Sequence, residues 1–182
     1  MSPMTTHRTR PDLDLDLLDR SIRAIPDPEI PVISINDLGI VRGIDVLDGA
    51  DESDPAVVRV TITPTYSGCP AMGAIADAIE ATVRRHGHTA DVVTRLSPAW
   101  TTDWMSEGGK ESLRRFGIAP PTGRASLWPE GPVAVDLRVR SVTCPQCGSA
   151  DTEELARFGA TACKALRRCL ACREPFEEFK AI

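Results

Sequence analysis

The sequence predicts an α+β protein in which a small mixed-sheet α/β domain precedes a C-terminal, four-cysteine zinc-ribbon-like module. Two observations indicate this division. Segments that alternate apolar and polar residues, as strands do, flank a segment of helical periodicity in the first two thirds of the chain. Closer to the C-terminus, two C-x-x-C pairs stand about twenty residues apart, which is typical of a tetrahedral metal site. A chain of 182 residues has room for one ordinary domain and one such module.

The chain is expected to begin with a disordered tail and a helix. Residues 1–11 are polar and show no apolar pattern. A helix is expected over 12–25, because its leucines and isoleucines share one face and aspartates occupy the first turns, where the helix dipole favours them. Pro26 ends this helix and opens a stiff, acidic, proline-rich loop that extends to Pro31.

Strands are expected next along the chain. The alternation is clearest over 57–63, where Val58, Val60 and Ile62 fall on one face. The other elements expected in this stretch are a short β-prone segment at 32–36, a strand at 38–46 and a polar turn at 48–55.

A helix is expected to follow the loop 64–70. Pro70 suits a first helical position, the apolar residues after it form one stripe, and Gly87 ends the helix. The elements expected after it are a strand at 91–96, an aromatic loop at 97–104 and a charged helix at 107–116, with Gly117 as its stop.

The expected domain boundaries follow from these elements. Residues 12–118 form the α/β domain, and residues 119–132, which hold four prolines and two glycines, are typical of a linker. The zinc-ribbon-like module spans 133–182. The segments expected inside it are a strand at 133–142 that leads into the first cysteine pair, and two segments, 161–168 and 175–180, that pair or pack around the metal.

The cysteine pairs are the strongest indication of a site. Cys144 and Cys147 form the first pair, and Cys169 and Cys172 form the second. Thiolates are soft ligands and closed four-thiolate sites are usually structural, so the expected occupant is a structural zinc ion. An iron–sulfur cluster is the alternative. Cys163, just before the second pair, is expected to be a small buried hydrophobe, and a role as an alternative ligand stays open.

Cys69 stands alone between an expected strand and an expected helix, flanked by Gly68 and Pro70. This position points its sulfur at the unpaired amides of a helix N-terminus, where the dipole lowers the thiol pKa and favours the thiolate that binds metal. Thr65 is one of several hydroxyl residues beside it. A buried structural cysteine at a turn is the alternative interpretation.

Two further pairs of side chains could contribute to a site. Asp27 and Glu29 could supply carboxylate ligands or an acidic docking surface, although such proline-rich turns more often cap structure and remain solvated. Trp100 and Trp104 could cover a pocket or a partner site, or could lie in the core.

Composition and missing motifs argue against several classes of function. A formal net charge of −5 is not that of a nucleic-acid-binding protein. No apolar run reaches membrane-spanning length and the first residues lack the apolar core of a signal peptide, so a cytoplasmic protein without a membrane partner is expected. There is no phosphate loop, no nucleophile elbow and no catalytic constellation that the three histidines could complete. An enzyme that acts by itself is therefore not expected.

Several of these motifs together resemble known protein families. The segments 27–31, 37–39 and 63–72 resemble the small domain of SufT-like iron–sulfur assembly factors. The segments that resemble the PaaD family, the D subunits of the phenylacetyl-CoA epoxidase system, are 96–104, 144–149, 158–165 and 169–176. Ala160 departs from the family pattern, in which a serine is expected. Together the resemblances cover nearly the whole chain.

The resemblance implies a compact mixed sheet flanked by helices and a place in bacterial phenylacetate catabolism. In that pathway a multicomponent di-iron oxygenase epoxidises the aromatic ring of phenylacetyl-CoA, with electrons from an iron–sulfur reductase. The D component is implied to be an accessory subunit, not the catalytic one, with the other subunits, especially the reductase, as its partners. Its implied role is maturation of the reductase cluster or of the di-iron centre, or assembly of the complex.

Three hypotheses follow for the function. In the first, a metal-maturation factor uses Cys69 as a transient ligand for iron or an iron–sulfur cluster, with Asp27, Glu29 and Thr65 nearby. Because one thiol cannot hold a cluster, two subunits of a homodimer could bridge it. The second hypothesis is an electron-transfer component with a cluster on the four paired cysteines. The third is a structural scaffold that holds the oxygenase subunits together.

Overall fold

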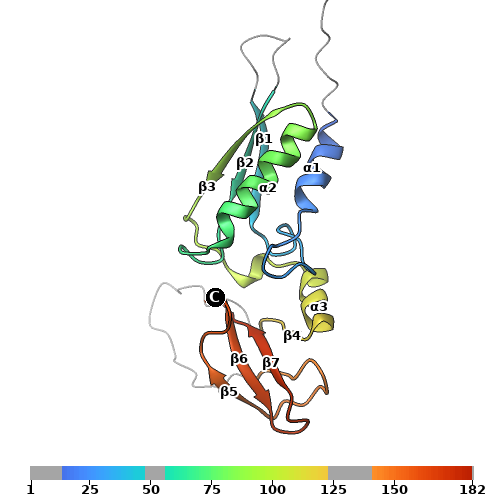
Figure 1. The fold of residues 1–182 in the computed structure, drawn as a ribbon, viewed down its shortest axis with the longest axis vertical. Coiled ribbons are helices and arrows are strands. Elements are labelled where there is room, and N and C mark those ends of the chain that lie inside the picture. The colour runs from blue at the N-terminus through green and yellow to red at the C-terminus, as the bar shows by residue number, and fades with distance from the viewer. Residues whose placement is uncertain (1–13, 48–55, 123–140, 182) are drawn as a thin grey trace, which may run out of the picture.

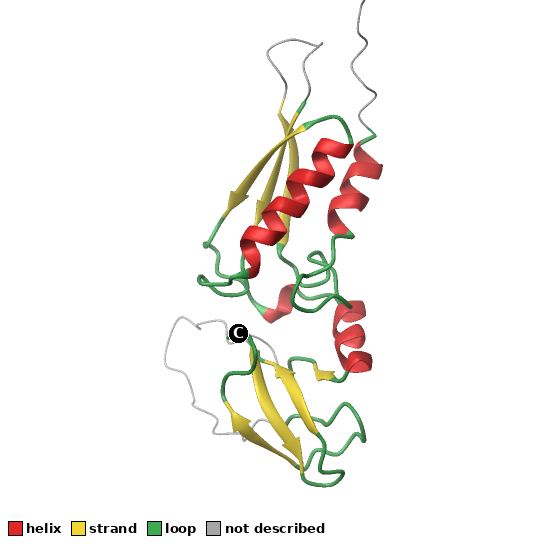
Figure 2. Cartoon of the chain, in the orientation of Figure 1, coloured by secondary structure: helices red, strands yellow, loops and turns green. Residues whose placement is uncertain are grey.

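Two β-sheets lie at opposite ends of an elongated molecule (Figure 1). The computed structural model describes residues 14–47, 56–122 and 141–181. Helices cover one face of the first sheet, whereas the second sheet consists of strands joined by loops (Figure 2). The predicted α+β class, with a mixed sheet and a four-cysteine ribbon, is confirmed. No helix within the described ranges is long and apolar enough to cross a membrane.

Some of the predictions concern residues that the structure does not describe. The predicted tail 1–11, the predicted turn 48–55, and most of the predicted linker 119–132 and strand 133–142 lie outside the described residues. The division of the chain into domains at these boundaries therefore stays a prediction.

The first sheet joins β1 (Val41–Leu47), β2 (Val57–Ile62) and β3 (Thr89–Thr94) in that order. β1 is antiparallel to β2, and β2 is parallel to β3, because a helix carries the chain back along the sheet between β2 and β3. The alternating valines and isoleucine of β2 are fully buried, as predicted.

Some predicted extended segments differ from the structure; the strand predicted at 91–96, for example, spans Thr89–Thr94. The predicted strand 32–36 is instead a series of turns, in which Ser34 forms an isolated bridge with Pro26. Its isoleucines are buried without forming a strand, since they fill the core from a loop. The predicted strand 38–46 begins only at Val41, because Gly39 turns the chain in a left-handed conformation with φ of 73°.

The three α-helices of the described residues agree with the predicted ones to within a few residues. They are α1 (Leu15–Arg23), α2 (Ala71–Arg85) and α3 (Glu107–Phe116). α2 packs its predicted apolar stripe against the first sheet, with α1 beside it (Figure 1). α3 begins where the Ser106 hydroxyl accepts the Gly109 amide at 2.9 Å, and it ends at Gly117, whose φ is 94°.

The second sheet is built from β4 (Ile118–Ala119), β5 (Thr152–Ala156), β6 (Lys164–Cys169) and β7 (Pro175–Phe179), in the order β4-β7-β6-β5. The antiparallel pairing of β6 with β7 confirms the expected pairing of these two segments. The sequence does not predict β5, because cross-strand ion pairs such as Glu153 with Arg168 stabilise it in place of apolar alternation. β4 is too short to show a pattern.

Trp100 lies where the two halves of the molecule meet. Its indole N–H donates to the Leu38 carbonyl at 2.9 Å, and its ring centroid lies 6.0 Å from that of Phe179 in β7. Trp104 is half-buried, and the Arg42 guanidinium lies 3.6 Å from its ring centroid. Of the two interpretations of these tryptophans, packing is the one that the structure supports.

The left-handed turn at Gly39 generates a testable prediction about stability. A Cβ atom at Gly39 would lie 2.6 Å from both Cβ and the carbonyl oxygen of Trp104, and the backbone there has positive φ. Gly39→Ala is expected to lower the free energy of unfolding by about 3 kcal/mol. The cost of placing alanine in a left-handed backbone conformation adds to the cost of overpacking its Cβ atom against Trp104. The measurement is the denaturant midpoint of the metal-loaded protein.

Gly73→Ala in α2 is the matched control for this experiment. A Cβ atom at Gly73 would meet nothing within 4 Å. This substitution is expected to leave stability unchanged or raise it by up to about 1 kcal/mol, because alanine has the higher helix propensity. Equal midpoints for the two variants would contradict the role assigned to Gly39.

Candidate functional site

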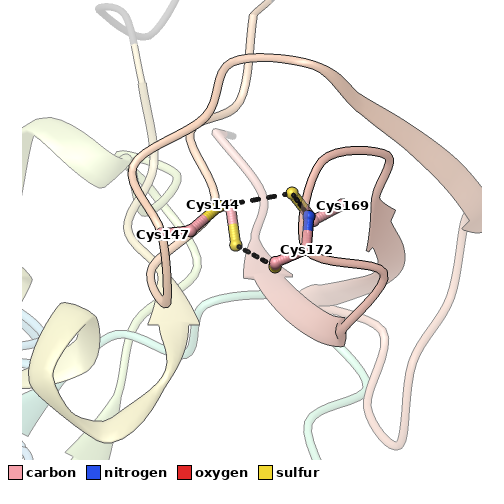
Figure 3. Close-up of side chains that lie close together, drawn as sticks. All are labelled: Cys144, Cys147, Cys169 and Cys172. Atoms are coloured by element: carbon pink, nitrogen blue, oxygen red, sulfur yellow. Dashed lines mark hydrogen bonds between the residues drawn. The ribbon is translucent and has the colours of Figure 1, made fainter.

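The four paired cysteines come together at the second sheet (Figure 3). Their Sγ atoms all lie within 4.8 Å of one another, with 3.8 Å between Cys144 and Cys172 and 3.5 Å between Cys147 and Cys169. Four thiolates at about 2.3 Å from one zinc ion form a tetrahedron with edges of about 3.8 Å. The quartet, as we call these four residues, therefore fits a single ion. An iron–sulfur cluster binds its thiolates to separate iron atoms, so it would need sulfur atoms that lie farther apart than these.

Two similar knuckle turns build the quartet. In the first, the Gly148 amide donates to the Cys144 carbonyl at 2.9 Å, and Gly148 has φ of 76°. In the second, the Arg173 amide donates to the Cys169 carbonyl at 3.0 Å, and Arg173 has φ of 69°. Each C-x-x-C pair is thus followed by a residue in the left-handed conformation. This residue turns the chain back and brings the two sulfurs of the pair to one side.

The thiols of the quartet differ in their affinity for protons. The Cys172 amide, which donates to Sγ of Cys169 at 3.5 Å, is the main cause that lowers the pKa of Cys169 to about 7. The Glu174 amide favours the thiolate of Cys172, but burial and the neighbouring sulfurs raise the pKa of that thiol to about 12. Four thiolates in one place therefore need a cation, and metal binding would release protons.

Cys163 lies apart from the quartet. It immediately precedes β6, and Cys169 ends that strand, so six extended residues, or about 20 Å, separate them. Its side chain is buried, in agreement with the small-hydrophobe interpretation. However, it belongs to the core of the N-terminal half and not to the small core around the quartet.

Cys69 lies at the N-terminus of α2, as the sequence predicts. This end of the helix points toward the second sheet (Figure 1), and the Ala71 amide donates to the sulfur. The predicted lowering of its pKa is nevertheless wrong. Burial raises the pKa of the Cys69 thiol, and the charges of Glu29 and Cys163 raise it further, so one helix amide does not offset them.

The acidic loop before β1 reaches the same place. Asp27 is buried, and its Oδ1 accepts the amides of Glu29 at 2.9 Å and of Ile30 at 2.8 Å, so this carboxylate caps the turn. Glu29 is half-buried. Burial and the Asp27 charge raise its pKa, and the nearby Lys164 ammonium opposes that shift.

The structure therefore brings together side chains that the sequence places in three separate segments. We call Asp27, Glu29, Cys69 and Cys163 the thiol–carboxylate cluster. Thr65 is buried in the loop that leads to Cys69, and the Tyr66 hydroxyl of that loop hydrogen-bonds with the Ala162 backbone. Sequence reasoning missed the membership of Cys163, because no local spacing relates it to Cys69.

Two family models match separate parts of the chain. Residues 18–94 match the family described as iron-sulfur cluster assembly protein, and residues 129–180 match the PaaD zinc beta ribbon domain. An Escherichia coli (strain K12) protein named as the D subunit of 1,2-phenylacetyl-CoA epoxidase is 46% identical over 162 residues. The alignment covers 87% of this chain and 87% of that protein.

Two solved structures are also similar to part of the chain. A crystal structure of the domain of unknown function DUF59 from Bacillus anthracis is 29% identical, with a TM-score of 0.44, and covers 54% of this chain and 89% of that one. A solution structure of a Mycobacterium tuberculosis protein associated with Fe-S complex assembly and repair is 28% identical, with a TM-score of 0.36. It covers 64% of this chain and 98% of that one.

The geometry of the quartet predicts which cysteines determine the metal content. Cys147→Ser removes one of four thiolates and is expected to abolish retention of the bound ion when the protein is dialysed against a mild chelator. Cys163→Ser is the control, and it should keep the ion of the quartet as the wild type does, because its sulfur lies outside the quartet. Elemental analysis after dialysis measures both. Loss of the ion from Cys163→Ser alone would contradict this assignment.

The charges around Cys69 predict its reactivity. Near pH 8, close to the ordinary thiol pKa of about 8.5, Cys69 should react with iodoacetamide more slowly than an unperturbed cysteine. Glu29→Gln removes a negative charge, lowers the pKa of Cys69 and should accelerate the reaction several-fold. Mass spectrometry of the Cys69 peptide measures the rate. Glu80→Gln on the exposed face of α2 is the control, and equal rates for all three proteins would contradict the electrostatic account.

Proposed function

The chain belongs to the PaaD family, the D subunits of the phenylacetyl-CoA epoxidase system, and on this premise we propose that it is an accessory component that helps to assemble an iron–sulfur cluster or the di-iron centre of that system. The relationship to the Escherichia coli protein, across 87% of both chains, supports the membership of the system. The match of residues 18–94 to iron-sulfur cluster assembly proteins supports the assembly role.

The observation that carries the assembly role is the position of Cys69 within the thiol–carboxylate cluster. Cys69 is half-exposed at a helix N-terminus, and its pKa is raised by burial and then by the charges of two nearby carboxylates. Such a thiol keeps its proton until a cation arrives, and the cation then favours the thiolate. We propose that iron, alone or within a cluster, is the cargo bound here, with Glu29 as the carboxylate ligand, because its charge affects the thiol more than that of Asp27 does.

In this proposal the quartet holds a structural zinc ion. Among the described residues, the buried core beside it consists of Ala119, Val142, Cys144, Cys169 and Phe176, so two of these five are themselves ligands. A sheet whose described core includes two of the ligands depends on the bound ion for its fold, and structural zinc supplies apparent binding energy of about 10–16 kcal/mol. The close sulfur–sulfur distances favour this single ion over an electron-transfer cluster.

The proposed partners are the other subunits of the epoxidase, above all the iron–sulfur reductase and the subunit that carries the di-iron centre. The chain itself would not catalyse the epoxidation. Within the described residues, the quartet is the only group of three or more metal-ligating side chains whose ligand atoms all lie within 4.8 Å of one another. A closed four-thiolate site leaves no position for substrate or oxygen.

Substitution of Cys69 tests this function in the complete epoxidase system. When Cys69→Ser is co-expressed with the other subunits, ring epoxidation and the iron content of the reductase or the oxygenase are expected to fall together by about tenfold or more. The zinc content of the variant should stay at that of the wild type. Epoxidation assays with elemental analysis of each purified subunit measure these effects.

Ser67→Ala is the control, because Ser67 is exposed in the same loop. Full epoxidation with normal iron content in the Cys69→Ser system would reject the assembly role. Failure of the subunits to co-purify, with normal iron in each of them, would point instead to a scaffold.

A further inference from the structure

The backbone of the second sheet holds Cys163 in place at the start of β6. The Cys163 carbonyl accepts the Lys180 amide at 2.9 Å, and the Lys164 amide donates to the Thr161 carbonyl at 3.1 Å. The Thr161 hydroxyl lies 3.0 Å from Sγ of Cys163. The position of this thiol therefore depends on the fold of the second sheet.

The second sheet also delivers Cys163 to the N-terminal half of the molecule. Cys163 and Phe179 are buried in the core that the first sheet and its helices form, and Cys69 packs against the same core. The hydrogen bond between Tyr66 and the Ala162 backbone joins the loop that precedes Cys69 to the loop that precedes Cys163. Two segments far apart in the sequence thus meet with a thiol on each.

The charges around the two thiols are shared. The Glu29 carboxylate raises the pKa of both Cys69 and Cys163, beyond the main effect of burial. Asp27 raises the pKa of Cys69 as well, and the pKa of Tyr66 is raised by burial and then by both thiols. Lys164 is the only cationic group among the causes of these pKa shifts, and its Nζ lies 2.7 Å from Oε2 of Glu177. Several groups in this neighbourhood can therefore carry a negative charge. A bound cation would neutralise most of that charge.

We infer that Cys163 is a second thiolate ligand of the iron cargo, so that one chain holds its cargo between its two sheets with Cys69, Cys163 and Glu29. This inference rests on the proposed assembly function and deepens it. Two soft thiolates and one hard carboxylate suit iron, as Fe²⁺ or within a cluster. A second thiolate from the same chain removes the need for a homodimer to bridge the cargo.

The looseness of this cluster agrees with a transient site. Among the described residues, the quartet alone brings three or more ligand atoms within 4.8 Å of one another. The thiol–carboxylate cluster is wider and would supply three ligands, so bound iron would keep a coordination position for a ligand of a recipient protein. A closed site retains its ion, whereas an assembly factor must release one.

Anaerobic loading of the full-length, zinc-containing protein tests the inference. Wild type, Cys69→Ser, Cys163→Ser and the double variant are loaded in one arm with Fe²⁺ alone and in the other with Fe²⁺ and sulfide. The first arm detects a bound ion and the second a cluster. Iron per chain and the visible absorption of thiolate-bound iron are measured, and zinc content and the unfolding midpoint verify the fold.

Each single variant is expected to bind iron at least about tenfold more weakly than the wild type. The double variant should bind more weakly still, but by less than the two single losses combined, because the two sulfurs act on one ion. If Cys163→Ser binds like the wild type while Cys69→Ser does not, the role of Cys163 is overturned and the proposed function stands. If both variants bind like the wild type, or the wild type binds no iron, both proposals fail.

A measurement on the wild type covers the case in which Cys163→Ser does not fold. X-ray absorption at the iron edge, in the arm without sulfide, counts the thiolate sulfurs bound to iron while zinc stays in the quartet. Two sulfurs per iron are expected. A single sulfur would overturn the role of Cys163 and leave Cys69 as the ligand.

Discussion

The buried indole of Trp100 joins the parts of the molecule on which the candidate cargo site depends. It hydrogen-bonds the Leu38 carbonyl in the turn before β1, and its ring packs near Phe179 of the second sheet. Two of the five buried residues in the described core of the second sheet are cysteines of the quartet, so this contact and the quartet together hold the sheet in its position and its fold. Because Cys163 is held beside the C-terminal end of β7, the same packing sets where that thiol lies relative to Cys69.

The chain combines two arrangements of thiols that differ in what they can do. The quartet surrounds one point at distances that match a tetrahedral ion, and its knuckle amides favour thiolates. The thiol–carboxylate cluster is open, and burial and carboxylates favour the protonated thiols there. Coordination that is complete resists exchange, whereas an incomplete set of ligands can bind and release. The first arrangement therefore suits a structural ion and the second a cargo.

Local signals account for the successes and failures of the sequence predictions. The end of α3 was predictable because Gly117 stops the helix, and the quartet was predictable because the C-x-x-C spacing is itself that of a knuckle turn. The segment 32–36 looked like a strand because isoleucine favours strands, but its isoleucines fill the core from turns. β5 carried no apolar alternation, since ion pairs to β6 take its place. These errors arise where tertiary packing overrides local preference.

The sequence by itself determined the fold class, the metal-binding quartet and the place of Cys69 between β2 and α2, because each of these depends on residues near one another in the chain. Tertiary structure alone decided what surrounds Cys69. A helix N-terminus predicts a lowered thiol pKa, yet Glu29 and Cys163 come from other segments, and with burial they raise it. Electrostatic interaction depends on distance through space, and the sequence does not state that distance for residues that only the folded core brings together.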